Sequence, residues 1–333
     1  MSISASPSKS PRLSILMPVF NEEANLRDGD VWRRLKALAP QLAPLELEFI
    51  FIDDGSRDQT FALLEKLQQE ELSQPITLLR FTRNFGAWAA IRAGLEHSRG
   101  DAAFIQTIDG EEPPELILQL VARWQEGWEV VWLEREARQD SLKSRLFARV
   151  YTYLMQRLVV PQYPDKGVAV PLLDRRVIDF LVRSRESSTP LIPLLYWAGF
   201  KQTSVPYVRT ARRLGQSGWT FSKLVRIFAD SFLAFTLFPI RLFSLFGAAA
   251  ATVAFLWALG LLLYKLTQGG LVTGYTSMML VMLFFAGIQM VFLGVMGEYL
   301  WRILEQVRGR PQFVLDPRRS ADLSATPAAE KKE

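Results

Sequence analysis

Residues 47–60 have the sequence LEFIFIDDGSRDQT, and this stretch decides the fold class. Its first six residues are mostly aliphatic or aromatic, which favours a buried strand. The next four, DDGS, favour a turn, and Asp58 could cap a helix that follows. A strand that ends in a polar turn and leads into a helix is the repeating unit of α/β proteins. Taken alone, DDGS could also be no more than a turn.

The same alternation of strand and helix patterns continues on both sides of this stretch. Further strands are predicted at residues 13–19, 76–81, 102–108 and 129–133, and helices at residues 25–38, 58–69, 87–97 and 114–125. Such alternation predicts a Rossmann-like, mostly parallel sheet with helices on both faces. Ligands of these sheets bind beyond the carboxyl ends of the strands, where this sequence places polar residues.

The composition limits the chemistry that the chain can perform. Of 333 residues, none is cysteine and only one, His97, is histidine. We expect His97 to interact with a helix C-terminus and not to take part in catalysis. Acid, base and metal chemistry must therefore depend on carboxylates. No G-x-G-x-x-G or P-loop pattern occurs, which disfavours a dinucleotide-binding dehydrogenase or a P-loop enzyme.

Two stretches, 242–264 and 277–296, contain no charged residue and indicate a membrane protein. A helix of about 20 residues spans a hydrocarbon core of roughly 30 Å, so these stretches predict a C-terminal two-helix transmembrane hairpin. Helices buried in a large soluble protein are the alternative. The flanking basic residues are Lys223, Arg226, Arg241, Arg302, Arg308 and Arg310. The positive-inside rule then predicts an integral inner-membrane protein whose N-terminal domain and termini are cytoplasmic.

These patterns divide the chain into segments. We expect a disordered tail at residues 1–12, an α/β domain at residues 13–220, an interfacial helix at residues 221–241 and a basic cytoplasmic tail at residues 297–333. Within the domain, residues 140–159 predict an amphipathic helix on the membrane surface, because basic and apolar residues alternate at helical spacing. Small residues such as Gly247 and Ala251 could pack in a homo-oligomer, and no nucleic-acid partner is predicted.

The order of several motifs is more specific than any one of them. MPVFNEE, FIDDGSRDQT, RNFGAWAAIRAGL and DGEEPPEL follow one another and precede the apolar hairpin. In this order they resemble family 2 glycosyltransferases of the GT-A fold, in the branch that makes polyprenyl-phosphate sugars, and the resemblance extends over residues 13–310. It implies a metal-dependent, inverting enzyme that uses a nucleotide diphosphate sugar as donor and a polyprenyl phosphate as acceptor.

The resemblance implies a nucleotide site in the loops after the first two strands. The residues that match it are Pro18, Val19, Asn21, Glu22, Asp53 and Asp54. Asp53 would accept a hydrogen bond from the edge of the base, because a carboxylate recognises a ring N–H.

The metal motif departs from the family pattern. The family usually has D-x-D-x-Q, whereas this chain has Thr107-Ile108-Asp109-Gly110-Glu111. Hard cations prefer oxygen ligands, so we predict that Asp109 and Glu111 bind Mg²⁺ or Mn²⁺, with Thr107 as a weak hydroxyl ligand. An acidic turn before a helix is the alternative, and Glu112 and Glu115 are interpreted as acids of the first helical turn.

Arginines are predicted to bind the phosphates. For the acceptor phosphate the candidates are Arg135, Arg138 and Arg145, each of which could instead serve only to bind the membrane surface. For the donor diphosphate the matching residues are Arg209, Arg213, Ser217 and Trp219, and Gly218 replaces the usual lysine. The implied catalytic residues are Asp109, Arg209 and Arg212.

The predicted reaction is transfer of one sugar from UDP-glucose or a similar donor to a polyprenyl phosphate. The alternative is a catalytically weak relative that binds nucleotide sugar or lipid as a membrane-anchored regulator, a hypothesis motivated by Thr107, Gly218 and the apolar pair Ala87-Trp88. A processive polysaccharide synthase is disfavoured because it would need more spans and a Q-x-x-R-W segment, and QSGW at residues 216–219 lacks the arginine.

Overall fold

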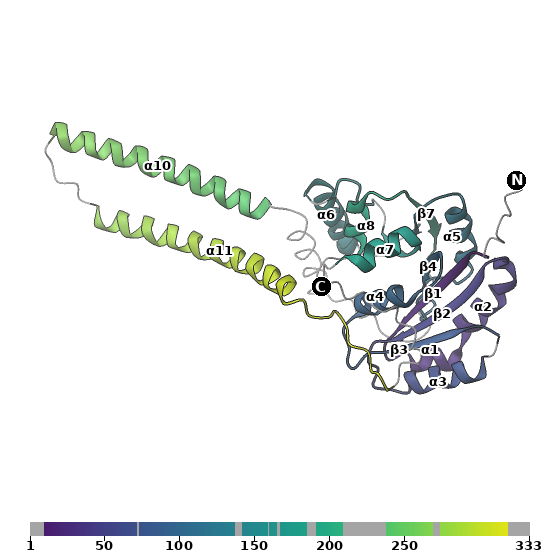
Figure 1. The fold of residues 1–333 in the computed structure, drawn as a ribbon. Coiled ribbons are helices and arrows are strands. Elements are labelled where there is room, and N and C mark those ends of the chain that lie inside the picture. Colours follow the sequence, from purple (N-terminus) through teal and green to yellow (C-terminus); the bar gives the residue numbers. More distant parts are fainter. Residues whose placement is uncertain are drawn as a thin grey trace, which may run out of the picture.

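The structure of the chain is a computed structural model that describes residues 10–71, 73–136, 142–158, 160–164, 167–184, 191–208, 238–268 and 274–318. The N-terminal part is an α/β domain and the C-terminal part is a pair of long helices that projects away from it (Figure 1).

A seven-stranded sheet forms the centre of the domain, in the order β3-β2-β1-β4-β6-β5-β7. The five strands predicted from sequence are present as β1 (Arg12–Val19), β2 (Glu46–Asp53), β3 (Ile76–Arg80), β4 (Ala102–Ile105) and β5 (Val130–Arg135). The strands β1, β2, β3 and β4 are parallel, which confirms the α/β class. Their carboxyl ends therefore meet at one edge of the sheet.

Two further strands make the sheet mixed. The strand β6 (Val168–Asp174) lies between β4 and β5 and is antiparallel to both, while β7 (Gln202–Tyr207) pairs parallel with β5 at the edge. Both contain a proline, Pro171 and Pro206, and β7 is rich in polar residues. Their sequences therefore lack the simple apolar pattern of a strand, and we did not predict them.

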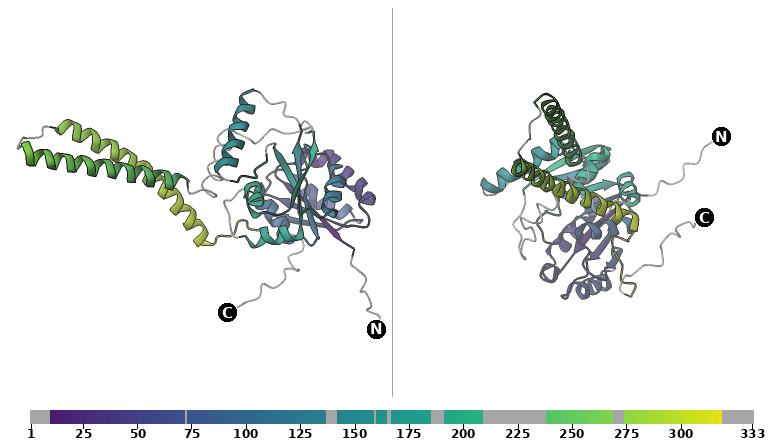
Figure 2. Two further views of the ribbon diagram at one scale, coloured as in Figure 1. Left: turned by 90° about the horizontal axis from the view of Figure 1, so that it is seen from above. Right: turned by 90° about the vertical axis from the view of Figure 1, so that its left-hand side faces the viewer.

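Helices cover both faces of the sheet, as expected for alternating strands and helices (Figure 2). On one face lie α2 (Asp30–Leu38), α3 (Thr60–Glu70) and α5 (Leu116–Gln125), and on the other lie α4 (Ala87–His97), α7 (Arg175–Arg183) and α8 (Leu191–Ala198). Alternate residues of β2 face the two layers: Phe49 and Phe51 contact Trp32, whereas Ile50 and Ile52 belong to the layer that contains Ala90. This alternation fixes which strand residues reach each face.

One predicted helix is interrupted. Residues 25–38 were expected to form a single helix, but Gly29 adopts a left-handed backbone at φ 63° and separates α1 (Glu23–Asp28) from α2. Glycine takes this conformation at no steric cost, so it ends one helix and begins the next. A short 3₁₀ helix, η1 (Ala39–Leu42), follows α2. The helix expected at residues 140–159 is α6 (Leu142–Leu158).

The C-terminal helices are longer than the apolar stretches that predicted them. They are α10 (Phe238–Gln268) and α11 (Tyr275–Arg308), which lie side by side as a hairpin (Figures 1 and 2). Within the described residues, one stretch is long and apolar enough to cross a membrane, Phe284–Arg308, whereas the apolar stretch Leu245–Trp257 of α10 is shorter. The two-helix transmembrane hairpin therefore stays a prediction.

After α11 the chain returns to the α/β domain. Gly309 ends the helix with a left-handed backbone, and residues 310–318, which we call the C-terminal strap, run along the end of β3 (Figure 1). Leu315 forms an antiparallel bridge with Phe81. Sequence analysis described residues 297–333 as a basic cytoplasmic tail and did not predict the strap; the cytoplasmic location stays a prediction.

Candidate functional site

The loops after β1 and β2 are fastened to each other at the carboxyl edge of the sheet. Asn21 has a left-handed backbone at φ 54°, which asparagine tolerates better than most residues. Its side-chain oxygen accepts a hydrogen bond from the Arg57 N–H at 3.0 Å, and its own N–H donates to Ser56 Oγ at 2.9 Å. The Glu22 N–H donates to the Thr60 hydroxyl at 2.9 Å. These bonds hold the first loop against the DDGS turn.

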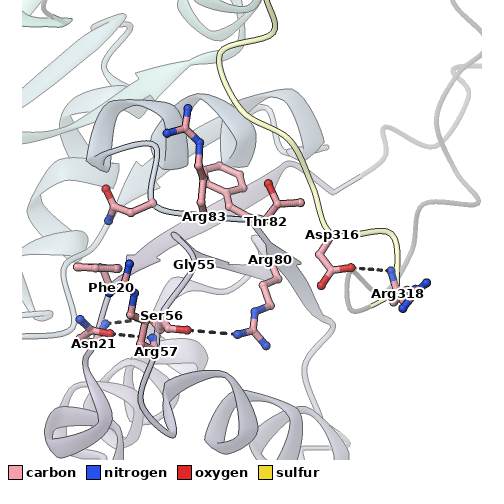
Figure 3. Close-up of a pocket in the computed structure, with 12 residues that line it drawn as sticks. Phe20, Asn21, Gly55, Ser56, Arg57, Arg80, Thr82, Arg83, Asp316 and Arg318 are labelled. Carbon is pink, nitrogen blue, oxygen red and sulfur yellow. Dashed lines mark hydrogen bonds between the residues drawn. The ribbon is translucent and has the colours of Figure 1, made fainter.

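A pocket of about 630 Å³ opens beside these loops (Figure 3). We call it the arginine-lined pocket, because its walls include Arg57, Arg80, Arg83 and Arg318. Phe20, 41% exposed, stands at one side of it with Asn21, and Asp316 lies near the other side. Guanidinium groups favour phosphate through forked hydrogen bonds, and an exposed ring offers a surface for stacking. The pocket suits an anion that carries a flat ring.

The two aspartates of the DDGS turn are buried, whereas Gly55 and Ser56 of the same turn line this pocket. Asp53 is 0% exposed; its Oδ1 accepts from the Ser56 N–H at 2.9 Å, and its Oδ2 lies 3.3 Å from Arg80 Nε. Burial raises the pKa of Asp53, and the Ser56 and Arg80 contacts oppose that rise. The Asp53 carboxylate is therefore buried at the strand end and paired within the protein. A contact between Asp53 and a base stays a prediction.

Asp54 connects β2 to the loop that precedes α4. Its carboxylate oxygens accept hydrogen bonds from the N–H groups of Phe85 at 2.6 Å and Gly86 at 2.9 Å. Burial raises the pKa of Asp54, while these two donors oppose that rise. In this structure Asp54 therefore positions the loop, and a direct role in binding nucleotide stays a prediction.

Gly55 allows the Arg83 loop to approach the DDGS turn. It has a left-handed backbone at φ 69°, and a Cβ atom placed there would lie 2.5 Å from the Arg83 carbonyl carbon. Any larger residue would push this loop away. Arg83 is important because it lines the arginine-lined pocket and also a second, larger pocket. The two pockets therefore adjoin at this side chain.

The second pocket has a volume of about 1010 Å³ and is mostly apolar, so we call it the apolar pocket. Its apolar walls include Phe85, Trp88, Ile91, Leu191, Ile192 and Pro193. At one end Asp109, Glu111 and Glu112 line it, and Trp301 and Arg308 of α11 line it as well. It thus reaches from the acidic turn after β4 to the base of the helical hairpin.

The acidic turn is held by the buried side chain of Gln106. Its amide group donates to the carbonyl oxygens of Thr107 at 2.9 Å and Glu112 at 3.1 Å, which closes the turn. Asp109 Oδ1 accepts from the Thr107 hydroxyl at 2.8 Å and from the Glu111 N–H at 3.2 Å. Asp109 and Glu111 are thereby presented on one side of the turn, at the apolar pocket.

Glu112 is not the helical-turn acid that we predicted. It is 4% exposed and lies before α5, with Oε2 at 2.6 Å from the Thr107 hydroxyl and Oε1 accepting from the Tyr207 hydroxyl at 3.2 Å. Burial raises the pKa of Glu112, and Asp109 and Glu111 raise it further. Glu115 does lie at the start of α5, where it forms an ion pair with Arg34 at 2.5 Å.

The acidic turn fits a divalent cation only in part. No group of three or more Asp, Glu or His side chains within the described ranges is arranged to hold a metal ion. Asp109 and Glu111 offer two carboxylates, and Thr107 a hydroxyl, at the same pocket. Mg²⁺ is commonly bound by one or two carboxylates together with substrate phosphates and water. These residues therefore suit a cation that is completed by a bound diphosphate.

Of the remaining predicted site residues, some lie at or near the apolar pocket and others lie outside the described part of the chain. Pro18 and Arg135 line the apolar pocket, and the Arg135 Nε donates to the Tyr207 hydroxyl at 3.3 Å. Val19 is buried, and its carbonyl oxygen accepts from the Asp54 N–H at 2.9 Å. Arg145 belongs to α6, but its side chain lies outside the described part. Also outside the described residues are Arg138, Arg209, Arg212, Arg213, Ser217, Gly218 and Trp219.

Several pocket residues were not identified from sequence. They are Arg57, Arg80, Arg83, Arg308, Arg310, Asp316 and Arg318. Arg83 stands within the quoted motif RNFG, so its position after a predicted strand was a usable signal. The residues of α11 and the strap gave no such signal, because only the folded chain brings them back to the sheet.

Comparison with known proteins gives the same family over most of the chain. A sequence model for Glycosyl transferase family 2 matches residues 14–180. An uncharacterized glycosyltransferase of Bacillus subtilis is 33% identical over 304 residues, covering 91% of this chain and 92% of that protein. The bactoprenol glucosyl transferase of Shigella phage SfX is 31% identical over 310 residues, covering 92% of this chain and 100% of that protein.

A further relative differs in the sugar that its name specifies. The undecaprenyl-phosphate 4-deoxy-4-formamido-L-arabinose transferase of Pseudomonas aeruginosa is 35% identical over 320 residues, covering 95% of this chain and 93% of that protein. Among solved structures, the mannosyltransferase PcManGT from Pyrobaculum calidifontis, in complex with GDP-Man and Mn²⁺, has a TM-score of 0.42 and 18% identity, covering 79% of this chain and 83% of that chain.

Proposed function

Because the chain belongs to glycosyltransferase family 2, we propose that it transfers one sugar from a nucleotide diphosphate sugar to a polyprenyl phosphate. Relatives that match more than nine-tenths of the chain are named for this kind of transfer, one with glucose and bactoprenol and one with a formamido-arabinose and undecaprenyl phosphate. The observation that carries the proposal is that a polar, arginine-lined pocket and a large apolar pocket adjoin at Arg83.

The two pockets differ in the ligand that each suits. The nucleoside diphosphate of the donor, UDP-linked glucose or a similar sugar, would occupy the arginine-lined pocket at the strand ends. The polyprenyl phosphate would place its chain along the apolar wall towards Trp301, with its phosphate near Arg135, Arg308 and Arg310. Arg83 would then lie where the donor diphosphate and the acceptor phosphate approach each other.

The reaction needs little general-base chemistry, because the acceptor phosphate is already an anionic nucleophile. One of its oxygens would attack the anomeric carbon while the bond from that carbon to the diphosphate oxygen breaks, which inverts the anomeric centre and releases the nucleoside diphosphate. Guanidinium groups such as Arg83 would orient both phosphates and reduce their mutual repulsion. Mg²⁺ or Mn²⁺ bound by Asp109 and Glu111 would neutralise charge on the departing diphosphate.

The helical hairpin supports a membrane location. The side chains of Phe255, Leu256 and Trp257 in α10 and of Val281, Met282 and Phe284 in α11 are all exposed, at 55% to 71%. Exposed apolar side chains along two long helices suit a lipid environment. We propose that both helices span the inner membrane, with the catalytic domain and termini in the cytoplasm.

The proposal is tested on the purified full-length chain in detergent micelles. UDP-sugars and GDP-sugars are supplied singly, with undecaprenyl phosphate and Mn²⁺, Mg²⁺ or a chelator, and nucleotide release and lipid-linked sugar are measured. The expected result is metal-dependent release of UDP or GDP that requires the lipid. Nucleotide binding without transfer for every pair would favour a catalytically weak relative instead.

A further inference from the structure

The arginine-lined pocket lies at an edge of the described sheet, so one of its sides lacks a neighbouring strand. Strand order places β3 last on this side, and β3 is followed by pocket residues Thr82 and Arg83. Beyond β3 the sheet offers no further main-chain surface against which a ligand could rest. The element that occupies this position is the C-terminal strap.

The strap is fixed to the end of β3 by backbone hydrogen bonds. The Thr82 N–H donates to the Val314 carbonyl at 3.0 Å, and the Asp316 N–H donates to the Arg80 carbonyl at 2.7 Å. These two bonds flank the bridge between Phe81 and Leu315 and continue the sheet by one short segment. The strap therefore has a defined register on β3.

Apolar contacts hold one side of the strap against the core layer that contains α4. The Phe313 ring stacks on Phe81 with a centroid distance of 5.1 Å and an interplanar angle of 12°. Phe313 and Leu315 also pack against the core layer that contains α4. Side chains that alternate with these two then point towards the other side of the strap, which is the pocket side.

The end of the strap presents a charged pair to the pocket. Asp316 Oδ1 accepts from the Arg318 N–H at 3.0 Å, and both side chains line the arginine-lined pocket (Figure 3). In the close-up they lie beyond Arg80, across the pocket from Phe20 and Asn21. The strap thus supplies the wall that the sheet edge lacks, and it adds a guanidinium to that wall.

We propose that the C-terminal strap is part of the donor site and that Asp316 and Arg318 bind the nucleoside diphosphate portion of the nucleotide sugar. The inference rests on the proposed function, since it assigns the arginine-lined pocket to the donor. It also connects the two parts of the molecule: α11 passes directly into the strap through Gly309, so the second hydrophobic helix and the nucleotide wall belong to one continuous segment.

The test compares two truncations of the full-length chain in detergent, with UDP and GDP as the probes and binding measured by calorimetry. Truncation after Arg310 removes residues 311–318 of the strap, and truncation after Arg318 retains the whole strap. We expect the first to weaken nucleotide binding about tenfold or more, the value of one or two charge-assisted hydrogen bonds, and the second to bind like the full chain. Equal affinity of both truncations would overturn the inference.

Point variants keep the inference testable if the shorter truncation does not fold. Asp316→Ala and Arg318→Ala leave Phe313 and Leu315 in place, so we expect weaker binding at an unchanged melting temperature, with partial recovery in Arg318→Lys. The matched control is Val307→Ala, which changes an exposed residue of α11 that lines neither pocket. Unchanged affinity in both alanine variants contradicts the inference.

A further variant distinguishes an error in the inferred role of the strap from an error in the proposed function. Asn21→Ala changes the opposite wall of the same pocket. If it weakens binding while the strap variants do not, the donor pocket stands and the strap has no part in it. If the full-length chain binds neither UDP nor GDP, the proposed function fails together with the inference.

Discussion

At the scale of single residues, Thr107 and Glu112 together shape the acidic turn. Thr107 stands where the family pattern has its first aspartate, and its hydroxyl contacts both Asp109 and Glu112. A hydroxyl has one proton, so Thr107 can donate to only one of these two carboxyl groups at a time. The turn therefore keeps a carboxyl group beside position 107 although the sequence there has none.

The carboxylates of this turn should be needed for metal-dependent transfer. We expect Asp109→Ala and Glu111→Ala each to lower turnover on the order of 100-fold, because a bound cation contributes several kcal/mol to charge stabilisation. The measurement is turnover as a function of Mn²⁺ concentration. The control is Glu126→Ala, which removes only an exposed ion pair with Arg123. Full activity of both turn variants would mean that the acidic turn binds no essential metal.

The variant Asp54→Asn tests whether Asp54 positions the loop that contains Phe85 and Gly86. Asp54→Asn places an amide donor against one of the backbone N–H groups of Phe85 and Gly86, so one hydrogen bond is replaced by a repulsive contact. We expect the free energy of unfolding to fall by about 1–3 kcal/mol. The Michaelis constant for the lipid acceptor should rise, since Phe85 lines the apolar pocket. Thermal unfolding and steady-state kinetics measure the two effects, and an unchanged melting temperature would refute the positioning role.

At the scale of elements, the errors of prediction have local causes. Strands β1 to β5 were predicted because their apolar patterns are strong, whereas β6 and β7 were missed because proline and polar residues interrupt theirs. Residues 25–38 have helical periodicity throughout, but a single left-handed glycine divides them. Periodicity therefore identified where elements occur better than where they end.

The contact between α2 and the start of α5 predicts a pH effect. The hydrogen bond from Arg34 lowers the pKa of Glu115 below its ordinary 4.5. A depressed pKa means that the pair stabilises the fold above pH 4.5 and that this contribution is lost as the pH falls through the lowered value. Because both side chains are partly exposed, we expect Glu115→Gln to cost only about 0.5 kcal/mol at pH 7.

This effect is measured by thermal unfolding of the wild type and of Glu115→Gln between pH 7 and pH 3. The two melting curves should converge on acidification. The matched control is Glu70→Gln, whose partner Lys66 lies 3.7 Å away on the same helix in an exposed pair. A difference that persists at the lowest pH would show that Glu115 acts through packing and not through its charge.

At the scale of the whole molecule, the hairpin and strap form an arm that leaves the domain and returns to it. The sequence predicts the hairpin from its apolar stretches, and the return is seen only in the tertiary structure (Figure 1). The apolar pocket and the arginine-lined pocket are both lined by this arm, through Arg308 and Arg318 respectively. The proposed membrane attachment and the proposed substrate binding thus involve one continuous segment.

The predicted topology can be tested with single cysteines, because the chain contains none. Gly274→Cys lies between α10 and α11, and Glu126→Cys lies at the end of α5. In intact cells, a membrane-impermeant maleimide should label Cys at position 274 from outside and should label position 126 only after lysis. Labelling of position 126 in intact cells would reverse the orientation.

The sequence by itself determined the α/β class, the family and the positions of the apolar stretches and the acidic turn, because these depend on local patterns and on their order along the chain. The tertiary structure alone decided that Asp53 and Glu112 are buried, that β6 enters the sheet antiparallel, and that Arg83 joins two pockets. It also decided that residues 310–318 close the edge beyond β3. The physical reason is that burial and pocket walls arise from contacts between residues far apart in sequence, on which no local pattern depends.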